Sequence, residues 1–558
     1  MFLSEMKIQD IEFGDTEGKR EFNSSEKISN MFFKDFYRNE PEKFISGKLR
    51  YIYGLKGTGK TSLLKYLEDT AISRDIKTMY ISYKDIKEEA DIIHEFRSEL
   101  KNSDDQDTYT LTFWRWYLLS LISKMFLNES KYDANNLIYN SKVKFFRLIA
   151  SLLDMISDVT VGTEEAKLNI SIGNAQLDIK WDSQTSSRIR YLEKTIKEKL
   201  SDKIIIFIDE LEISKLLSTY DVDAVLVKNL IRATRKLNDL NENLHIVLAV
   251  RSEVVGSIAV AGDEINKELE DFGYEIEWHR RKFDISHPLL SMYIQKMRYS
   301  MKIYAKKIYF DNIDEYDNIA FKINKMNNST IWYRWFPKFF GSIETPEFIL
   351  QNTWLRPRDL SRLFRTMQKY SHYKHSTLTQ SSYAEAIKKV GEESWQEIAE
   401  EFSSTYTVHK IEAITSILEK MQIIFLKDKF IEEASIKGIN EEEATKILND
   451  LYRVSAIGNC YVSYNNGKFS TTYRFAYRND KSLYEDRAIY IHRVIQHALG
   501  LTEFNKDLMS EHLSPKDKKK YQSQPYINNN NTKDEGSENF EEVFNLQDAL
   551  RESNIRVR

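Results

Sequence analysis

Residues 54–61 read G-L-K-G-T-G-K-T, between an apolar stretch at 49–53 and a stretch with helical spacing at 62–67. Because glycine adopts backbone conformations that other residues avoid, the three glycines let this loop turn its N–H groups toward phosphate oxygens. The helix that follows directs the positive end of its dipole at the same anion. The stretch therefore predicts a phosphate-binding loop between a strand and a helix, and with it an α/β fold with a parallel sheet.

Within this loop, Lys60 has the position that reaches the β- and γ-phosphates of a nucleotide, and Thr61 the position that ligates Mg²⁺. The alternative is a glycine-rich turn that only connects two elements. We favour nucleotide binding because every fixed position of the motif matches and both flanking elements agree. The predicted nucleotide contacts are Gly54, Leu55, Lys56, Gly57, Thr58, Gly59, Lys60, Thr61 and Ser62.

A second stretch, I-I-I-F-I-D-E at 204–210, indicates a strand that is buried on both faces of a parallel sheet. Ligands of open α/β sheets collect at the carboxyl ends of the strands, where this one carries two acids. We predict that Asp209 holds the metal and that Glu210 polarises the attacking water, with Glu212 as the substitute. The alternative is that the acidic pair opens a solvated loop.

A third apolar strand, 244–250, is followed by Arg251, which is a candidate sensor of the γ-phosphate or a surface residue that caps the strand. The segment 221–240 has helical character and carries Arg232 and Arg235. Either of these two is a candidate arginine finger across a subunit boundary. The alternative for both is a solvated arginine on a helix surface.

Residues 354–364 read W-L-R-P-R-D-L-S-R-L-F. Pro357 and Asp359 mark the start of a helix, since proline is favoured in the first turn and an acid there interacts well with the helix dipole. Arg356 and Arg358 then stand at the mouth of a helical lid. The alternative is a surface arginine pair at a helix cap.

Composition sets the broad class of the protein. The chain has 558 residues, 41% of them apolar, so we expect several globular domains. Its charged residues make up 30% and nearly balance, with a net charge of −4, so we expect no overall electrostatic attraction to nucleic acid. A single cysteine, Cys460, fits a reducing compartment. The first ten residues do not resemble a secretion signal, and the most apolar helix, 113–127, is too polar to span a bilayer. We expect a cytoplasmic protein without a membrane segment.

Shifts in pattern along the chain predict five regions. The second of them contains a large helical insert at about 86–200, with helices near 108–127 and 141–158 and a hairpin at 167–181. The regions are a helical lead-in at 1–47, a P-loop core at 48–285, a helical lid at 286–405, a winged-helix-like domain at 406–502, and a disordered tail at 503–558 with a candidate docking helix at 540–550.

The winged-helix prediction rests on helices at 411–425 and 441–452, followed by two strands joined by N-N-G-K. Asparagine followed by glycine is a strong signal for a two-residue hairpin turn. The fold often binds DNA, but helix 441–452 begins with three glutamates, which repel phosphate. A basic helix at 296–307 and the wing lysine Lys468 are the candidate DNA contacts. For the basic helix a solvated face is the alternative, and for the aromatic stretch 332–340 an aromatic core is favoured over base stacking.

With these motifs in this order, residues from about 30 to 500 resemble AAA-like and STAND-type P-loop ATPases. More narrowly, the chain is similar to bacterial ATPases with a G-x-K-G-[ST]-G-K-[ST] loop and an R-P-R-D-L helix. The resemblance implies ATP as the nucleotide, Mg²⁺ as the metal, and a cationic second sensor at Arg356 or Arg358. It also implies a role in bacterial antiviral defence, where such ATPases act as sensors or switches. Because the chain has a large insert, a candidate docking helix and no recognisable nuclease or protease segment, we predict a homo-oligomer that controls a separate effector protein. The alternative is a DNA-binding protein loaded by ATP, similar to replication-initiation ATPases.

Overall fold

The computed structural model describes residues 5–82, 106–127, 183–211, 222–252, 255, 265–280, 282–341, 343–371, 377–403, 405–465, 468–476, 482–484 and 487–501. Several predictions lie outside these residues. They concern the helix at 141–158, the hairpin at 167–181, Glu212, the turn residues 466–467, and the tail at 503–558 with its docking helix.

A five-stranded parallel sheet forms the core of the predicted P-loop region, with strands in the order β2-β3-β4-β1-β5. The strands are β1 (Tyr51–Gly54), β2 (Lys77–Ser82), β3 (Ile204–Leu211), β4 (Leu244–Arg251) and β5 (Gly273–Glu275). The predicted α/β fold with a parallel sheet is confirmed. The short strand β5 was not predicted, and β3 extends one residue beyond the acidic pair to Leu211.

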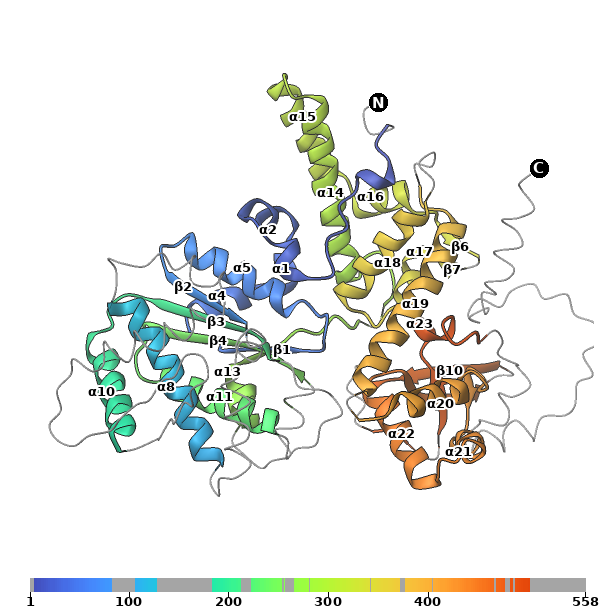
Figure 1. The fold of residues 1–558 in the computed structure, drawn as a ribbon. Helices are drawn as coiled ribbons and strands as arrows, with labels where there is room; N and C mark the ends of the chain where they lie inside the picture. The colour runs from blue at the N-terminus through green and yellow to red at the C-terminus, as the bar shows by residue number, and fades with distance from the viewer. Residues whose placement is uncertain are drawn as a thin grey trace, which may run out of the picture.

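Helices cover both faces of this sheet (Figure 1). One face packs against α4 (Glu40–Ile45) and α5 (Lys60–Ile72); the other packs against α8 (Gln106–Leu127), α10 (Ser183–Lys199), α11 (Val222–Asn238) and α13 (Ile265–Phe272). Alternate residues of β3 belong to the two hydrophobic clusters, with Phe207 on the α5 face and Ile206 on the α8 face. This two-sided burial explains why the strand reads as a continuous apolar run.

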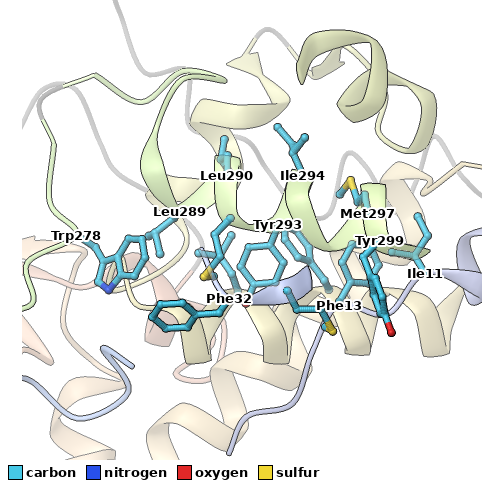
Figure 2. Packing of buried hydrophobic residues seen from close by; sticks show 14 of the residues in the cluster. Ile11, Phe13, Phe32, Trp278, Leu289, Leu290, Tyr293, Ile294, Met297 and Tyr299 are labelled. Atoms are coloured by element: carbon cyan, nitrogen blue, oxygen red, sulfur yellow. The ribbon is translucent and has the colours of Figure 1, made fainter. Parts of the chain in front are cut away.

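The N-terminal residues form short helices that pack against both the core and the lid. They are η2 (Ile8–Asp10), α1 (Gly18–Glu21), α2 (Ser25–Met31) and α3 (Lys34–Tyr37). Figure 2 shows Phe13 and Phe32 beside Tyr293 of the long lid helix α14 (Pro288–Ile308). All three side chains are buried in one cluster that continues to α5. The N-terminal residues therefore share a hydrophobic core with both neighbours.

The region that we predict to be a lid, residues 286–405, consists mainly of helices in its described part. After α14 come α15 (Ile313–Lys325), α16 (Asn328–Trp335), the hairpin β6 (Phe339–Phe340) and β7 (Ile343–Glu344), α17 (Thr345–Gln351), α18 (Pro357–Tyr370) and α19 (Gln380–Phe402). Trp332, Trp335 and Phe336 are fully buried, so the favoured interpretation of the aromatic stretch as a core is correct.

The favoured interpretation of the basic helix as a solvated face holds only at its C-terminal end, because the charges before it are buried or partly buried. Lys296 is only 2% exposed. The guanidinium group of Arg298 donates to the backbone carbonyls of Ile323 and Met326, at the end of α15. Burial, with Arg298 beside it, lowers the pKa of Lys302. The basic residues of α14 that remain exposed are Lys306 and Lys307.

The C-terminal module, which we predict to be a winged helix, consists of helices and a four-stranded antiparallel sheet. Its elements are α20 (Val408–Leu418), β8 (Ile424–Phe425), α21 (Lys427–Ile436), α22 (Glu441–Arg453), β9 (Ile457–Asn465), β10 (Lys468–Arg474), β11 (Ala488–Ile491) and α23 (Arg493–Gln496). Asn465 pairs with Lys468, as a two-residue turn requires. The helix predicted to reach Phe425 ends at Leu418, because Ile424 and Phe425 pair with β11 instead. Helix α21 and strand β11 were not predicted.

In the part of the chain that the structure describes, no helix combines the length and the apolar character needed to cross a bilayer.

Candidate functional site

The loop between β1 and α5 has the backbone geometry of a phosphate cradle. Gly57 and Gly59 have φ angles of 83° and 96°, in the left-handed region that favours glycine. The loop is closed internally by Thr58, whose backbone N–H and hydroxyl both donate to the carbonyl of Leu55, at 3.3 and 2.9 Å. Helix α5 begins directly after Gly59, so its N-terminus points into the loop.

Lys60 lies over this loop. Its ammonium group donates to the carbonyls of Gly54 and Leu55, at 2.8 and 2.9 Å. Lys60 also lines a cavity of about 190 Å³ beside the loop. The same cavity is lined by five further residues of the predicted nucleotide site: Lys56, Gly57, Gly59, Thr61 and Ser62.

The predicted metal carboxylate lines this cavity too. Asp209 is 2% exposed and shares the cavity wall with Thr61. The hydroxyl group of Tyr80, on β2, donates a hydrogen bond to its Oδ2 atom. A carboxylate and a hydroxyl suit Mg²⁺, which prefers oxygen ligands and completes its shell with phosphate and water. Asp209 therefore belongs to the cavity and not to a solvated loop. Glu210 lies in β3, but its side chain is outside the described structure.

Arg251 is the last residue of β4 and lies opposite Gly54 in the register of β1. Its side chain is 7% exposed and lines the same cavity as Lys60 and Asp209. The alternative interpretation, a surface residue that caps the strand, is therefore wrong.

Arg356 joins the lid to the loop. It is the N-cap of α18, and its guanidinium group contacts the carboxylate of Asp359 through Nε, at 2.9 Å, and Nη2, at 2.7 Å. Its Nη1 atom donates to the carbonyl of Lys56, at 3.1 Å. These bonds occupy the guanidinium group, and Arg356 is absent from the residues that line the cavity. Arg356 therefore has a structural role, in which it holds the start of α18 against the phosphate loop.

Arg358, two residues later, is oriented differently. Arg358 lines the cavity and packs closely against the loop. A Cβ atom added at Gly57 would lie 3.0 Å from the Cβ atom of Arg358. Its Nε atom is buried and has no hydrogen-bond partner among the described residues. Burial alone would raise the pKa of Glu397, but Arg362, Arg358 and Arg356 outweigh it and lower that pKa. Arg358 is thus the lid arginine that lines the cavity, and its Nη1 atom lies 3.9 Å from Glu397.

The N-terminal residues form a wall of the cavity that sequence reasoning missed. A Cβ atom on Gly18 would lie 2.8 Å from the hydroxyl of Ser62, at the start of α5. No motif marks this stretch, and its place above the loop depends on contacts with distant helices. The N-terminal residues that line the cavity are Asp15, Thr16, Glu17, Gly18, Lys19 and Glu21.

Trp278 also supports the site and was not predicted. Its indole N–H donates to the carbonyl of Thr58, at 2.8 Å. The ring stacks on Phe36, with 3.8 Å between ring centroids. These contacts hold the phosphate loop in place at Thr58.

The two candidate arginine fingers form ion pairs within the chain. Arg232 lies 3.2 Å from Asp107 of α8, and Arg235 lies 3.4 Å from Glu268 of α13. Neither lines the cavity.

Comparisons with known proteins give similarities of low identity. No protein-family model and no curated protein matches the chain. The ORC1 protein of Aeropyrum pernix in complex with DNA is 10% identical, covering 86% of this chain and 96% of that one, with a TM-score of 0.35. The ORC2 protein of the same organism, in its ADPNP–ADP complexes, is 11% identical, covering 83% and 91%, with a TM-score of 0.33. Its ADP form is 10% identical, covering 84% and 95%, with a TM-score of 0.29.

Proposed function

We propose that this protein is a Mg²⁺-dependent ATPase that acts as a nucleotide-controlled switch. One observation carries the proposal: a single cavity is lined by the phosphate loop, the carboxylate of Asp209, and two arginines. Arg251 comes from the core and Arg358 from the lid. Clustered cations and oriented backbone N–H groups around a buried carboxylate suit a metal-bound polyphosphate.

Each residue has a distinct role in this proposal. Lys60 contacts the β- and γ-phosphates, while Thr61 and Asp209 hold the metal ion. Glu210 orients the attacking water, and Arg251 and Arg358 contact the terminal phosphate. ATP is proposed over GTP because the chain resembles ATPases.

The contacts around Arg356 suggest how the state of the nucleotide reaches the C-terminal module. Arg356 bonds the carbonyl of Lys56, in the loop, and lies over the ring of Trp354, 4.9 Å from its centroid. The indole N–H of Trp354 donates to the carbonyl of Ser455, at 3.0 Å, and the ring stacks on His492. A phosphate loop that moves when the nucleotide loses its γ-phosphate would therefore move the winged-helix module through Arg356 and Trp354.

Nucleotide binding and hydrolysis test this proposal directly. Lys60→Ala removes the charge-assisted contact and should abolish ATP binding, measured by calorimetry. Glu210→Gln should bind ATP with unchanged affinity and hydrolyse it slowly. Lys43→Ala, at an exposed lysine of α4 that pairs with Glu40, is the matched control and should match the unmutated protein. Full ATP affinity in Lys60→Ala would refute the assignment of the site.

We extend the proposal to partners on the basis of the resemblance. The protein would form a cytoplasmic homo-oligomer and control a separate effector, in bacterial antiviral defence. An arginine finger from a neighbouring subunit often completes such a site. Mass measurement with and without ATP tests the oligomer, and a pull-down from native cells tests the effector. A strict monomer with full ATPase activity would contradict this extension.

Binding of DNA by the winged-helix module is a second candidate, favoured by the helices α21 and α22 and the β9–β10 hairpin. The exposed start of α22 opposes it, since it presents Glu441 and Glu442. DNA binding would weaken steeply with salt, because each neutralised phosphate releases a counterion. The absence of any salt-sensitive DNA shift in the presence of ATP would exclude this candidate.

A further inference from the structure

The segment 12–21 bridges the lid and the phosphate loop. On the lid side, the backbone N–H of Glu12 donates to the hydroxyl of Ser300, at 2.8 Å, and Asp15 lies 3.2 Å from Arg365 of α18. On the core side, Gly18 lies directly against the start of α5. Between these contacts the segment forms a wall of the nucleotide cavity. The position of this wall therefore depends on the lid as well as on the core.

A buried ion pair lies at the end of this segment. Glu21, on α1, is 7% exposed and contacts the ammonium group of Lys296, on α14, which is 2% exposed. The same ammonium group lies 3.5 Å from the carbonyl of Phe13 and 4.7 Å from the ring centroid of Tyr293. Gly14, with a φ of 87°, passes beside both charges, where a Cβ atom would collide with them.

The ion pair is connected to the lid helix that carries Arg358. The hydroxyl of Tyr293 donates to the carbonyl of Pro357, at 2.6 Å, and lies 2.6 Å from the hydroxyl of Ser361. Pro357, Ser361 and Glu21 all line the cavity. The pair thus joins α1 to α14, and Tyr293 joins α14 to α18, at the wall of the cavity.

Stability alone does not account for such a pair. Removing two charges from water costs about as much as their attraction returns, and a neutral pair of similar volume often folds as well. A fixed pair does give one defined geometry, and defined geometry around a ligand raises its affinity. Among the described residues, Oε1 of Glu21 accepts no hydrogen bond of regular geometry, so Lys296 supplies its compensating charge.

We propose that Glu21 and Lys296 are positioning residues for the nucleotide, which hold the segment 14–21 against the start of α5. The inference rests on the proposed nucleotide binding and goes beyond it, because it assigns part of the ATP affinity to a contact between α1 and α14. Neither residue touches the phosphates in this scheme; both act through the wall that they hold in place.

The test compares the unmutated protein with the double variant Glu21→Gln/Lys296→Met, which replaces both charges by neutral groups of similar size. We expect the double variant to keep its melting temperature without nucleotide but to bind ATP about tenfold more weakly in calorimetry, equivalent to about 1.4 kcal/mol. Amide hydrogen exchange without nucleotide should be faster in residues 14–21 and unchanged in α5. The matched control is Lys410→Met/Glu443→Gln, which removes a 2.9 Å pair in the winged-helix module.

The outcomes separate this inference from the proposed function. If the unmutated protein fails to bind ATP, the proposed function and the inference both fail. If it binds ATP and the double variant binds equally well, with unchanged exchange in residues 14–21, only the inference is overturned. Lys296→Met alone leaves a buried carboxylate without its counter-charge, so its lower melting temperature and its recovery in the double variant verify that the pair exists.

Discussion

The hydroxyl group of Tyr80, on β2, donates a hydrogen bond to the carboxylate of Asp209, on the neighbouring strand β3. The tyrosine ring is in turn covered by the ammonium group of Lys65, on α5, at 3.6 Å from the ring centroid. A buried carboxylate needs donors, because an unpaired charge loses its hydration. Tyr80 therefore holds one oxygen of Asp209 at the wall of the cavity that Thr61 also lines.

Replacement of Tyr80 by phenylalanine should weaken Mg²⁺ binding. Partners that orient a metal ligand typically contribute about tenfold or more to metal affinity. We expect the Mg²⁺ concentration for half-maximal ATP hydrolysis to rise by about tenfold, while ATP binding measured without Mg²⁺ stays unchanged. Tyr66→Phe, on α5, is the control, since that ring stacks on Phe32. An unchanged Mg²⁺ dependence in Tyr80→Phe would contradict a role in orienting Asp209.

The two lid arginines should respond differently to substitution. Arg358→Gln removes a cation from the wall of the cavity, so ATP affinity or turnover should fall by about tenfold with little change in melting temperature. Arg356→Gln removes the bidentate partner of the buried Asp359 and the bond to Lys56, so unfolding free energy should fall by about 2 kcal/mol.

Calorimetry and chemical unfolding of both arginine variants distinguish the roles. The reverse pattern, with Arg356 controlling turnover and Arg358 controlling stability, would contradict both assignments: Arg358 as the nucleotide sensor and Arg356 as the structural residue.

The fold of the core was predictable because its signals are local. The glycines of the loop, the apolar run of β3 and the Pro357 helix start each depend on a few neighbouring residues. Asp209 was predictable for the same reason, since the carboxyl edge of a parallel strand follows from the strand itself. Strand β5 escaped prediction because it has only three residues, Gly273–Glu275.

The remaining parts of the site depend on distant contacts, and no local pattern reports them. The wall formed by residues 15–21 exists because Asp15 meets Arg365 and Glu21 meets Lys296. Lys296 was interpreted as one charge of a basic helix, because periodicity alone does not indicate which lysine finds a buried partner. The same limit applies to Trp278, whose partner is a backbone carbonyl in the loop.

Stability should decrease as the pH is lowered from about 6.5 toward 4. Burial, with Lys203 and Arg50 nearby, lowers the pKa of His245 to about 4. Burial, with Arg280 and His279 nearby, lowers that of His287 to about 4 as well. An unfolded histidine titrates near about 6.5, so between these values the unfolded chain binds more protons than the folded one. The stability contributed by neutral histidines is present above this window and is lost as pH falls through it.

Each histidine should cost about 2 kcal/mol of unfolding free energy between pH 7 and pH 5. Urea unfolding of His245→Gln should therefore show a shallower decrease over this range than the unmutated protein. His409→Gln is the control, at a side chain that is 97% exposed. Equal pH dependence in both variants would mean that His245 is already protonated in the folded protein at pH 5.

Gly18 should tolerate no side chain without a loss of nucleotide affinity. A Cβ atom there would lie 2.8 Å from the hydroxyl and 3.1 Å from the backbone nitrogen of Ser62. Alanine in a helix is normally favoured over glycine by about 1 kcal/mol, so without this contact Gly18→Ala would stabilise the protein. We expect Gly18→Ala to weaken ATP binding instead, because the added Cβ atom forces the N-terminal wall away from the start of α5. Calorimetry should show affinity reduced by about fivefold to tenfold, a loss of about 1 kcal/mol.

The matched control for Gly18 is Gly438, in the winged-helix module, where φ is 74° and no atom of the described residues, the two chain neighbours aside, lies within 4 Å of a Cβ. Gly438→Ala should lower the unfolding free energy by about 1 kcal/mol through backbone strain alone and leave ATP affinity unchanged. The two variants thus have different effects: Gly18→Ala lowers the ATP affinity, and Gly438→Ala lowers the unfolding free energy. Gly18→Ala with the ATP affinity of the unmutated protein would place the N-terminal wall away from the nucleotide.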